Sequence, residues 1–178
     1  MRIPSGCSKN DKSVIIDKVK GLIFGAILGD SLGLATEGMT KDDILKNYGK
    51  GPIRFGMEDD EGVPFIRDDY RSSFDENDFG GDTEQQLLLL QCLLDSAGVF
   101  YYKDYAKSLK EYTKEGIEGL QKKPIGANGA IVRAAILGIP KFWDGTTVIE
   151  NTTNCCRLTH PDPRCMISCV IVSTLIAR

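Results

Sequence analysis

Apolar residues along most of the chain recur every three or four positions, which is the spacing of one face of an α-helix. The clearest pattern covers 82–97, a leucine-rich stretch that Gly98 ends. Asp82 is the expected N-cap of this helix, and Gln85 completes a capping-box pattern. No convincing hairpin or alternating strand occurs, so the pattern predicts an all-α fold built as a multi-helix bundle. Further helices are expected at 14–35, 101–120, 128–137, 146–158 and 161–178.

The helix expected at 14–35 carries a stripe of glycines spaced four residues apart, which places them on one face. Each glycine costs roughly 1 kcal/mol in helix propensity. Another backbone packed very close to this face would offset the cost, and ordinary helix packing is the alternative. The preceding residues, 1–12, are expected to form a flexible arm before a helical domain at 13–178. The stripe consists of Gly21, Gly25, Gly29 and Gly33.

The last expected helix is apolar nearly all round between Met166 and Ile176, which predicts a place at the centre of a bundle. Thr159 is its expected N-cap, with Pro161 near the first turn. The sequence shows no further helix to cover it. We therefore expect an incomplete version of a larger domain, or else a partner chain that covers this helix.

Composition narrows the possible partners and location. The chain has 178 residues, is 42% apolar and 26% charged, and carries a formal charge of -3, so we expect a globular protein that binds neither nucleic acid nor an anionic membrane. Its apolar run at 165–177 is too short to span a bilayer comfortably. A single histidine excludes a multi-histidine zinc site within the chain. Six cysteines without a CxxC motif, and a polar start, predict a reducing compartment, cytoplasmic or nuclear.

Oxygen-bearing side chains at two helix ends are candidates for chemistry. Asp82 and Thr83 at a helix start could hold magnesium, although Asp82 could equally be a simple N-cap. Asp30 and Glu37 lie seven positions apart, two helical turns, so their carboxylates could share one end of a helix. Glu37 there could position water or act as a general base, and a surface acid is the alternative. The stretch at 75–86 fails as a calcium loop, since it lacks the required ligands at its fifth and last positions.

Two further segments could contact a ligand. Gly126, Asn128 and Gly129 precede a helix, so their backbone N–H groups could hold a diphosphate, although a plain turn explains them as well. His160 lies at the start of the last expected helix, where two prolines that follow it stiffen the chain. It is either a polar binding residue or a structural one.

These segments, taken in order, resemble the ADP-ribosylglycohydrolase family. GLIFGAILGDSLGLATEG at 21–38 is similar to the family's opening helix, G-x-x-x-GDALG-x-x-x-E. NDFGGDTEQQLLLLQCLL resembles its first metal motif, usually D-W-T-D-D-T-D-Q before a leucine-rich helix. GANGAIVRAAILGI resembles its phosphate loop, and LTHPDPRC its T-H-x-D-P segment.

The resemblance implies an all-α hydrolase that cleaves the glycosidic bond at the distal ribose of ADP-ribose. The bond would join ADP-ribose to a protein side chain, to another ADP-ribose or to a small molecule. Two magnesium ions would hold the ribose hydroxyls and a water, with Asp82 and Thr83 among their ligands. Glu37 would lie near the reacting centre. The diphosphate would contact Gly126, Asn128 and Gly129, and His160 would contact the ligand.

Two departures from the family pattern concern the metal site. The family's T-D-D-T corresponds here to Gly80, Gly81, Asp82 and Thr83, and glycine has no side-chain oxygen. The family's second metal motif, of the D-x-D-T type, has no counterpart in this chain. Since a hard divalent ion prefers about six oxygens, we expect little or no magnesium-dependent hydrolysis by this chain alone. A non-catalytic relative that binds ADP-ribose or a partner protein, or serves as a structural protein, is the alternative.

Overall fold

The computed structural model describes residues 3–50, 66–75, 78–115 and 129–178. Within these ranges it has seven α-helices, one short 3-10 helix and no strand, which confirms the all-α prediction. The elements are α1 (Lys9–Leu34), α2 (Lys41–Tyr48), η1 (Arg71–Ser73), α3 (Gly81–Asp95), α4 (Tyr102–Glu115), α5 (Gly129–Leu137), α6 (Gly145–Arg157) and α7 (Pro163–Ile176).

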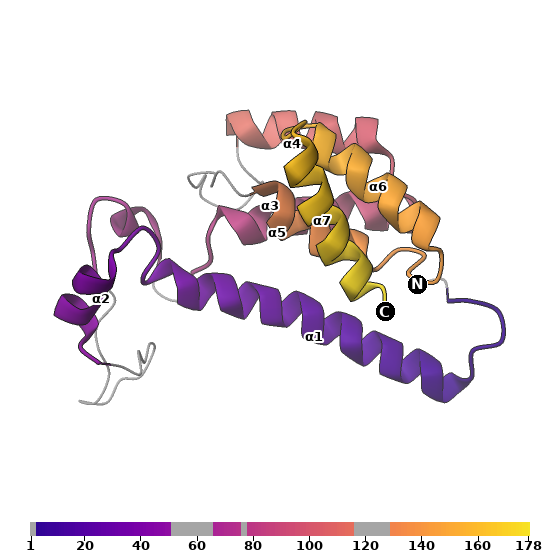
Figure 1. Ribbon diagram of the computed structural model, residues 1–178, viewed down its shortest axis with the longest axis horizontal. Coiled ribbons are helices and arrows are strands. Elements are labelled where there is room, and N and C mark those ends of the chain that lie inside the picture. The colour runs from indigo at the N-terminus through magenta and orange to yellow at the C-terminus, as the bar shows by residue number, and fades with distance from the viewer. Residues whose placement is uncertain (1–2, 51–65, 76–77, 116–128) are drawn as a thin grey trace.

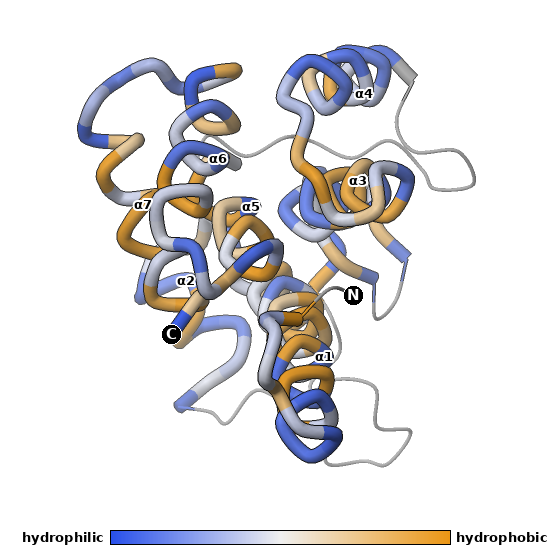
Figure 2. The backbone as a smooth tube through the Cα atoms, turned by 90° about the vertical axis from the view of Figure 1, so that its right-hand side faces the viewer, coloured by the Kyte–Doolittle hydropathy of each residue, from blue (hydrophilic) through white to orange (hydrophobic). Residues whose placement is uncertain are grey.

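Helices α3 to α7 form a compact group, and the long α1 runs along one side of it, with α2 beyond its C-terminal end (Figure 1). Helix α5 is central, since it packs against α3, α6 and α7. The main core consists of buried residues from α3, α4, α5 and α6. Figure 2 shows that apolar positions also run along α1 and α7, outside this core. In the described ranges, no helix has both the length and the hydropathy needed to cross a bilayer. The core residues are Leu89, Leu93, Tyr105, Leu109, Tyr112, Ile136, Leu137 and Cys155.

Two helices begin where local capping side chains place them rather than where the apolar pattern does. Helix α1 begins at Lys9, inside the segment expected to be an arm, because Ser8 and Asp11 form a reciprocal capping box. Helix α7 begins at Pro163, and its N-cap is Asp162. The prediction that Thr159 caps this helix was therefore wrong. A carboxylate followed by proline at the first helical position is the stronger start signal.

Helix α3 is capped from another helix. Its N-cap position is Gly80, which has no side chain to offer, and Asp82 lies in the first turn, so the prediction that Asp82 is the N-cap was wrong. The carboxylate of Asp30 on α1 performs this role. Its Oδ2 accepts hydrogen bonds from the N–H groups of Gly80 at 2.8 Å and Thr83 at 3.1 Å. This contact ties α1 to α3.

The glycine stripe of α1 has no close neighbour in the described part of the structure. A Cβ added at any of its four glycines would meet nothing within 4 Å, so the predicted close backbone contact was wrong for these residues. The close approach occurs instead at Gly138, directly after α5. A Cβ there would lie 2.5 Å from the carbonyl oxygen of Ser173 and 2.8 Å from the Cβ of Ile176 on α7.

Helix α7 lies at the surface of this chain. Cys169 and Ser173 are buried against the other helices, whereas Ile167, Ile171 and Leu175 are each more than half exposed. The prediction of a central, fully buried helix was therefore wrong for the described structure. What covers its outer face stays a prediction.

We expect Gly138→Ala and Gly25→Ala to change stability in opposite directions. The first forces a methyl group into the backbone of α7, which destabilises the protein by about 1–3 kcal/mol. The second replaces an exposed mid-helix glycine, which stabilises it by about 0.5–1 kcal/mol through helix propensity. Urea unfolding followed by circular dichroism measures both. A destabilising Gly25→Ala would show that another backbone packs on the stripe.

Candidate functional site

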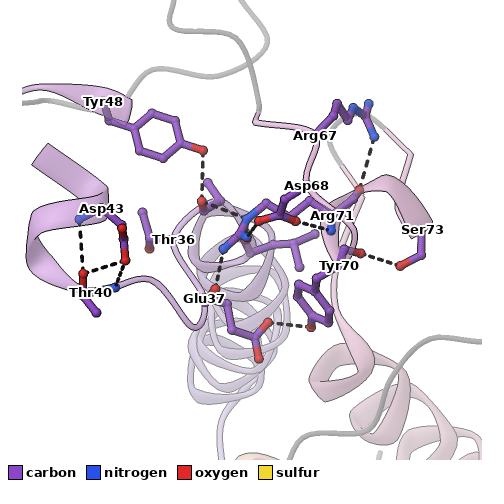
Figure 3. A network of polar contacts seen from close by, with 12 residues as sticks. Thr36, Glu37, Thr40, Asp43, Tyr48, Arg67, Asp68, Tyr70, Arg71 and Ser73 are labelled. Carbon is purple, nitrogen blue, oxygen red and sulfur yellow. Dashed lines mark hydrogen bonds and ion pairs between the residues drawn. The ribbon is translucent and has the colours of Figure 1, made fainter. Parts of the chain in front are cut away.

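The C-terminal end of α1 is held by Arg71, whose guanidinium group is almost completely buried. Its Nε donates to the carbonyl oxygens of Leu34 at 3.0 Å and Ala35 at 3.1 Å, and its NH2 donates to the carbonyl oxygen of Glu37. Asp68 pairs with the same guanidinium through NH1 (Figure 3). Because the last carbonyl groups of a helix lack partners within it, Arg71 satisfies them and fixes the turn that carries Glu37.

Glu37 is exposed, and its carboxylate is oriented by Tyr70. The Tyr70 hydroxyl donates to Oε2 of Glu37 at 2.8 Å, and Oε1 points away from it (Figure 3). Partial burial, followed by the hydrogen bond to Glu37 and its charge, raises the pKa of Tyr70 well above its ordinary value. Tyr70 therefore stays protonated at neutral pH and remains a donor that holds one carboxylate oxygen.

Asp82 lies in the first turn of α3, where Asp30 of α1 accepts the N–H groups of Gly80 and Thr83. The pKa of Asp82 is raised to about 6, first by burial and then by the negative charges of Asp30 and Glu37. Of the three carboxylates singled out in the sequence, hydrogen bonds therefore tie Asp30 to the helix start that carries Asp82, whereas Glu37 acts on Asp82 through its charge.

The start of α3 offers few ligands for a metal ion. Thr83 is fully buried in the helix, and Asp30 already accepts two backbone hydrogen bonds. A Cβ at Gly80 would lie 2.8 Å from Oδ1 of Asp30, so a larger side chain there would displace that carboxylate. In the part of the chain that the structure describes, no three His, Cys, Asp or Glu side chains are grouped as a metal site. These residues do not fit a two-magnesium centre.

A second polar network begins two residues beyond Thr83 on α3. Gln85 is buried, and its Oε1 accepts a hydrogen bond of 2.9 Å from NH1 of Arg133 on α5. The guanidinium of Arg133 also donates through NH2 to the Thr159 hydroxyl, and it lies over the Tyr105 ring at 5.8 Å. Thr159 in turn contacts Nδ1 of His160 at 2.7 Å. His160 is therefore placed by α5 and by the end of α6.

The predicted phosphate loop is only partly described. Gly126 and Asn128 lie outside the described residues. Gly129 is the first residue of α5, and a Cβ there would lie 2.6 Å from Oε1 of Gln85. Glycine at this position therefore lets the Gln85 amide pack against the N-terminus of α5.

Several residues of the site were missed in the sequence. Tyr70 and Arg71 belong to the long stretch at 36–79, whose weak periodicity gives no helix face on which to place them. Their partners come from α1, far away along the chain, so no local spacing signals the contact. Arg133 lies within the predicted phosphate-loop segment, but the sequence alone does not indicate which groups accept hydrogen bonds from a charged residue on an apolar helix.

The structure thus defines an all-α protein in which Asp30 of one helix caps the helix that carries Asp82, and Glu37 lies in the turn after the first of these helices. A family model described as ADP-ribosylglycohydrolase matches residues 11–178. The chain therefore belongs to the ADP-ribosylglycohydrolase family, as the sequence resemblance indicated. No curated protein and no solved structure matches the chain.

We expect the stability of the protein to fall as the pH rises from about 4 to about 6, in part through Asp82. Its pKa is 3.8 in an ordinary environment and about 6 in the fold, so the folded state binds more protons in this interval. Asp82→Asn removes this contribution, about 1 kcal/mol once solvent screening of a half-buried group is allowed for. Urea unfolding across this pH range measures the difference.

The matched control is Asp17→Asn, which changes an exposed carboxylate on α1. This variant should keep the pH dependence of the wild-type protein. If Asp82→Asn kept it as well, Asp82 would not face the other two carboxylates.

Proposed function

We propose that this chain is a hydrolase that cleaves the glycosidic bond at the distal ribose of ADP-ribose conjugates, with Glu37 at the reacting centre. Membership of the family supports the reaction class. The observation that supports the proposal is the exposed carboxylate of Glu37, which the Tyr70 hydroxyl holds at 2.8 Å in the turn after α1. An exposed carboxylate that is held in place by a neighbouring donor is suited to handling water and ribose hydroxyls.

The geometry around Glu37 supports a role in activating water. Tyr70 holds Oε2, which leaves Oε1 to accept a hydrogen from a water molecule. The oxygen of this water attacks the anomeric carbon of the ribose, and the bond from that carbon to the departing group breaks. The water's proton passes to Glu37, and the departing oxygen or nitrogen takes a proton from solvent.

The proposed binding groups for the rest of the substrate come from the segment that leads into α5 and from the residues that follow α6. Gly126, Asn128 and Gly129 would hold the diphosphate through backbone N–H groups at the start of α5. His160 would contact the same ligand, because Thr159 and Arg133 hold it at the end of α6. All six cysteines are free thiols, which supports the proposal of a reducing compartment, cytoplasmic or nuclear.

Magnesium binding is the part of the family pattern that the residues of this chain support least. The start of α3 offers the carboxylate of Asp82, while Thr83 is buried and Gly80 and Gly81 carry no oxygen. No catalytic step is assigned to a metal ion for this reason. The glycine pair also favours a second candidate function, a relative that binds ADP-ribose without cleaving it.

We expect ADP-ribose to bind the full chain with an affinity that does not depend on magnesium, because the described residues supply too few ligands for the ion. Titration calorimetry with ADP-ribose, in magnesium and in a chelator, measures this. Tight binding that requires magnesium would contradict our account of the metal site.

Hydrolysis of ADP-ribosylated peptides separates the two candidate functions. If Glu37 activates water, Glu37→Gln should lower the residual rate by about 100-fold or more while ADP-ribose still binds. The matched control is Glu150→Gln, an exposed glutamate on α6, which should leave the rate unchanged. Binding without any hydrolysis by the unmodified chain would favour the non-catalytic relative.

A further inference from the structure

The single histidine of the chain is held by backbone and side-chain contacts at the end of α6. The His160 N–H donates to the carbonyl oxygen of Cys156 at 2.8 Å, and its own carbonyl oxygen accepts from the Cys156 thiol at 3.3 Å. Its ring nitrogen Nδ1 lies 2.7 Å from the Thr159 hydroxyl oxygen. Backbone and ring are therefore both fixed, and the Thr159 hydroxyl is the neighbour that touches the ring at Nδ1.

The Thr159 hydroxyl is in turn fixed by Arg133. A guanidinium can only donate hydrogen bonds, so the Thr159 oxygen is the acceptor in its contact with NH2 of Arg133. The hydroxyl hydrogen is then available to Nδ1 of His160, which lies at hydrogen-bond distance. A nitrogen that accepts this hydrogen carries none of its own, so a neutral imidazole must carry its hydrogen on Nε2.

The environment of Arg133 suggests more than a packing role. The guanidinium is 1% exposed, and in the described ranges its acceptors are neutral: the Gln85 amide, the Cys155 carbonyl and the Thr159 hydroxyl. A buried charge without a carboxylate is costly in free energy, and its field strongly polarises the groups that accept from it. The Thr159 hydroxyl is the accepting group that reaches a titratable ring.

We propose that Arg133 is a positioning residue that acts through Thr159 to hold His160 as the Nε2–H tautomer. Arg133 directs the hydroxyl hydrogen of Thr159 to Nδ1, and the imidazole then carries its own hydrogen at Nε2. Such a donor suits an oxygen of a phosphate or a ribose rather than a positively charged group. This assignment deepens the proposed function, because the role of His160 as a substrate contact rests on that function.

Nitrogen-15 NMR of the imidazole tests this directly, since a chain with one histidine gives one set of ring signals. In the full chain without ligand, at a pH where the ring is neutral, we expect the Nε2–H tautomer. Thr159→Val keeps the shape of the side chain and removes the hydroxyl, so the share of the Nδ1–H tautomer should rise about fivefold, as for the loss of one neutral hydrogen bond. Thr159→Ser should restore the wild-type ratio.

Arg133 is tested by Arg133→Met, which should shift the tautomer ratio in the same direction although Thr159 is intact. If this variant does not fold, Arg133→Lys replaces it, because lysine keeps the charge but cannot reach Gln85 and Thr159 together. Thr146→Val, at the opposite end of α6, is the matched control and should change nothing. A dominant Nδ1–H tautomer in the wild-type chain, or a ratio that Thr159→Val leaves unchanged, would overturn the proposal.

Titration of the same variants with ADP-ribose separates this proposal from the proposed function. We expect Thr159→Val to weaken binding about fivefold and Thr159→Ser to restore it, as for one hydrogen bond to the ligand. A shifted tautomer ratio with unchanged ADP-ribose affinity would uphold the positioning by Arg133 and overturn the role of His160 in binding.

Discussion

The carboxylate of Asp30 is the contact on which the rest of the site depends. It reaches from near the C-terminal end of α1 to the first turn of α3 and accepts the N–H groups of Gly80 and Thr83. A helix start attracts negative charge because its first N–H groups lack partners in the helix. This one side chain therefore both caps α3 and fixes the distance between the two helices. The raised pKa of Asp82 follows partly from the same placement, since Asp30 contributes to it.

The first turn of α3 then lies between two polar regions of the molecule. On one side, Asp30 accepts the N–H groups of Gly80 and Thr83, and its charge together with that of Glu37 raises the pKa of Asp82. On the other side, Glu84 accepts a hydrogen bond of 2.7 Å from the Tyr112 hydroxyl, and Gln85 accepts from Arg133. One turn of helix thus connects the carboxylates proposed for chemistry with the network that holds His160. This arrangement requires the glycine at position 80, because a residue without a side chain leaves room for the Asp30 carboxylate.

The parts of the fold that follow from local sequence were predicted well. Helices α3, α5 and α6 begin and end close to the expected positions, because their apolar periodicity and flanking glycines are local signals. Tyr105, Leu109 and Tyr112 of α4 are buried at the three-to-four-residue spacing from which a helix was expected there. The short α2 was missed, since its eight residues lie in a stretch without clear periodicity. Its capping box, formed by Thr40 and Asp43, was the available signal.

The site was less predictable, because its geometry depends on contacts between distant segments. Glu37 and Asp82 were identified from residue type and family pattern, and their shared site stays a prediction. The sequence could not show that Asp30 would replace Asp82 as the cap of α3, because any oxygen-bearing side chain near a helix start is a plausible cap. Nor could it show that Arg71 would close the end of α1 from a segment without periodicity. When a side chain from a distant segment satisfies the end of a helix, no regular spacing of residues in the sequence signals the contact.

The most direct measurement of this account is the titration of Asp82, followed by carbon-13 NMR of its carboxyl group, in the Asp30→Asn variant. Asparagine keeps the shape and an accepting oxygen at the start of α3 but removes the charge. If Asp30 holds the two helices together as described, the pKa of Asp82 falls below the value of about 6 found with the native residue. A pKa of Asp82 that is the same in both proteins would contradict the placement of these carboxylates, and with it the site built on them.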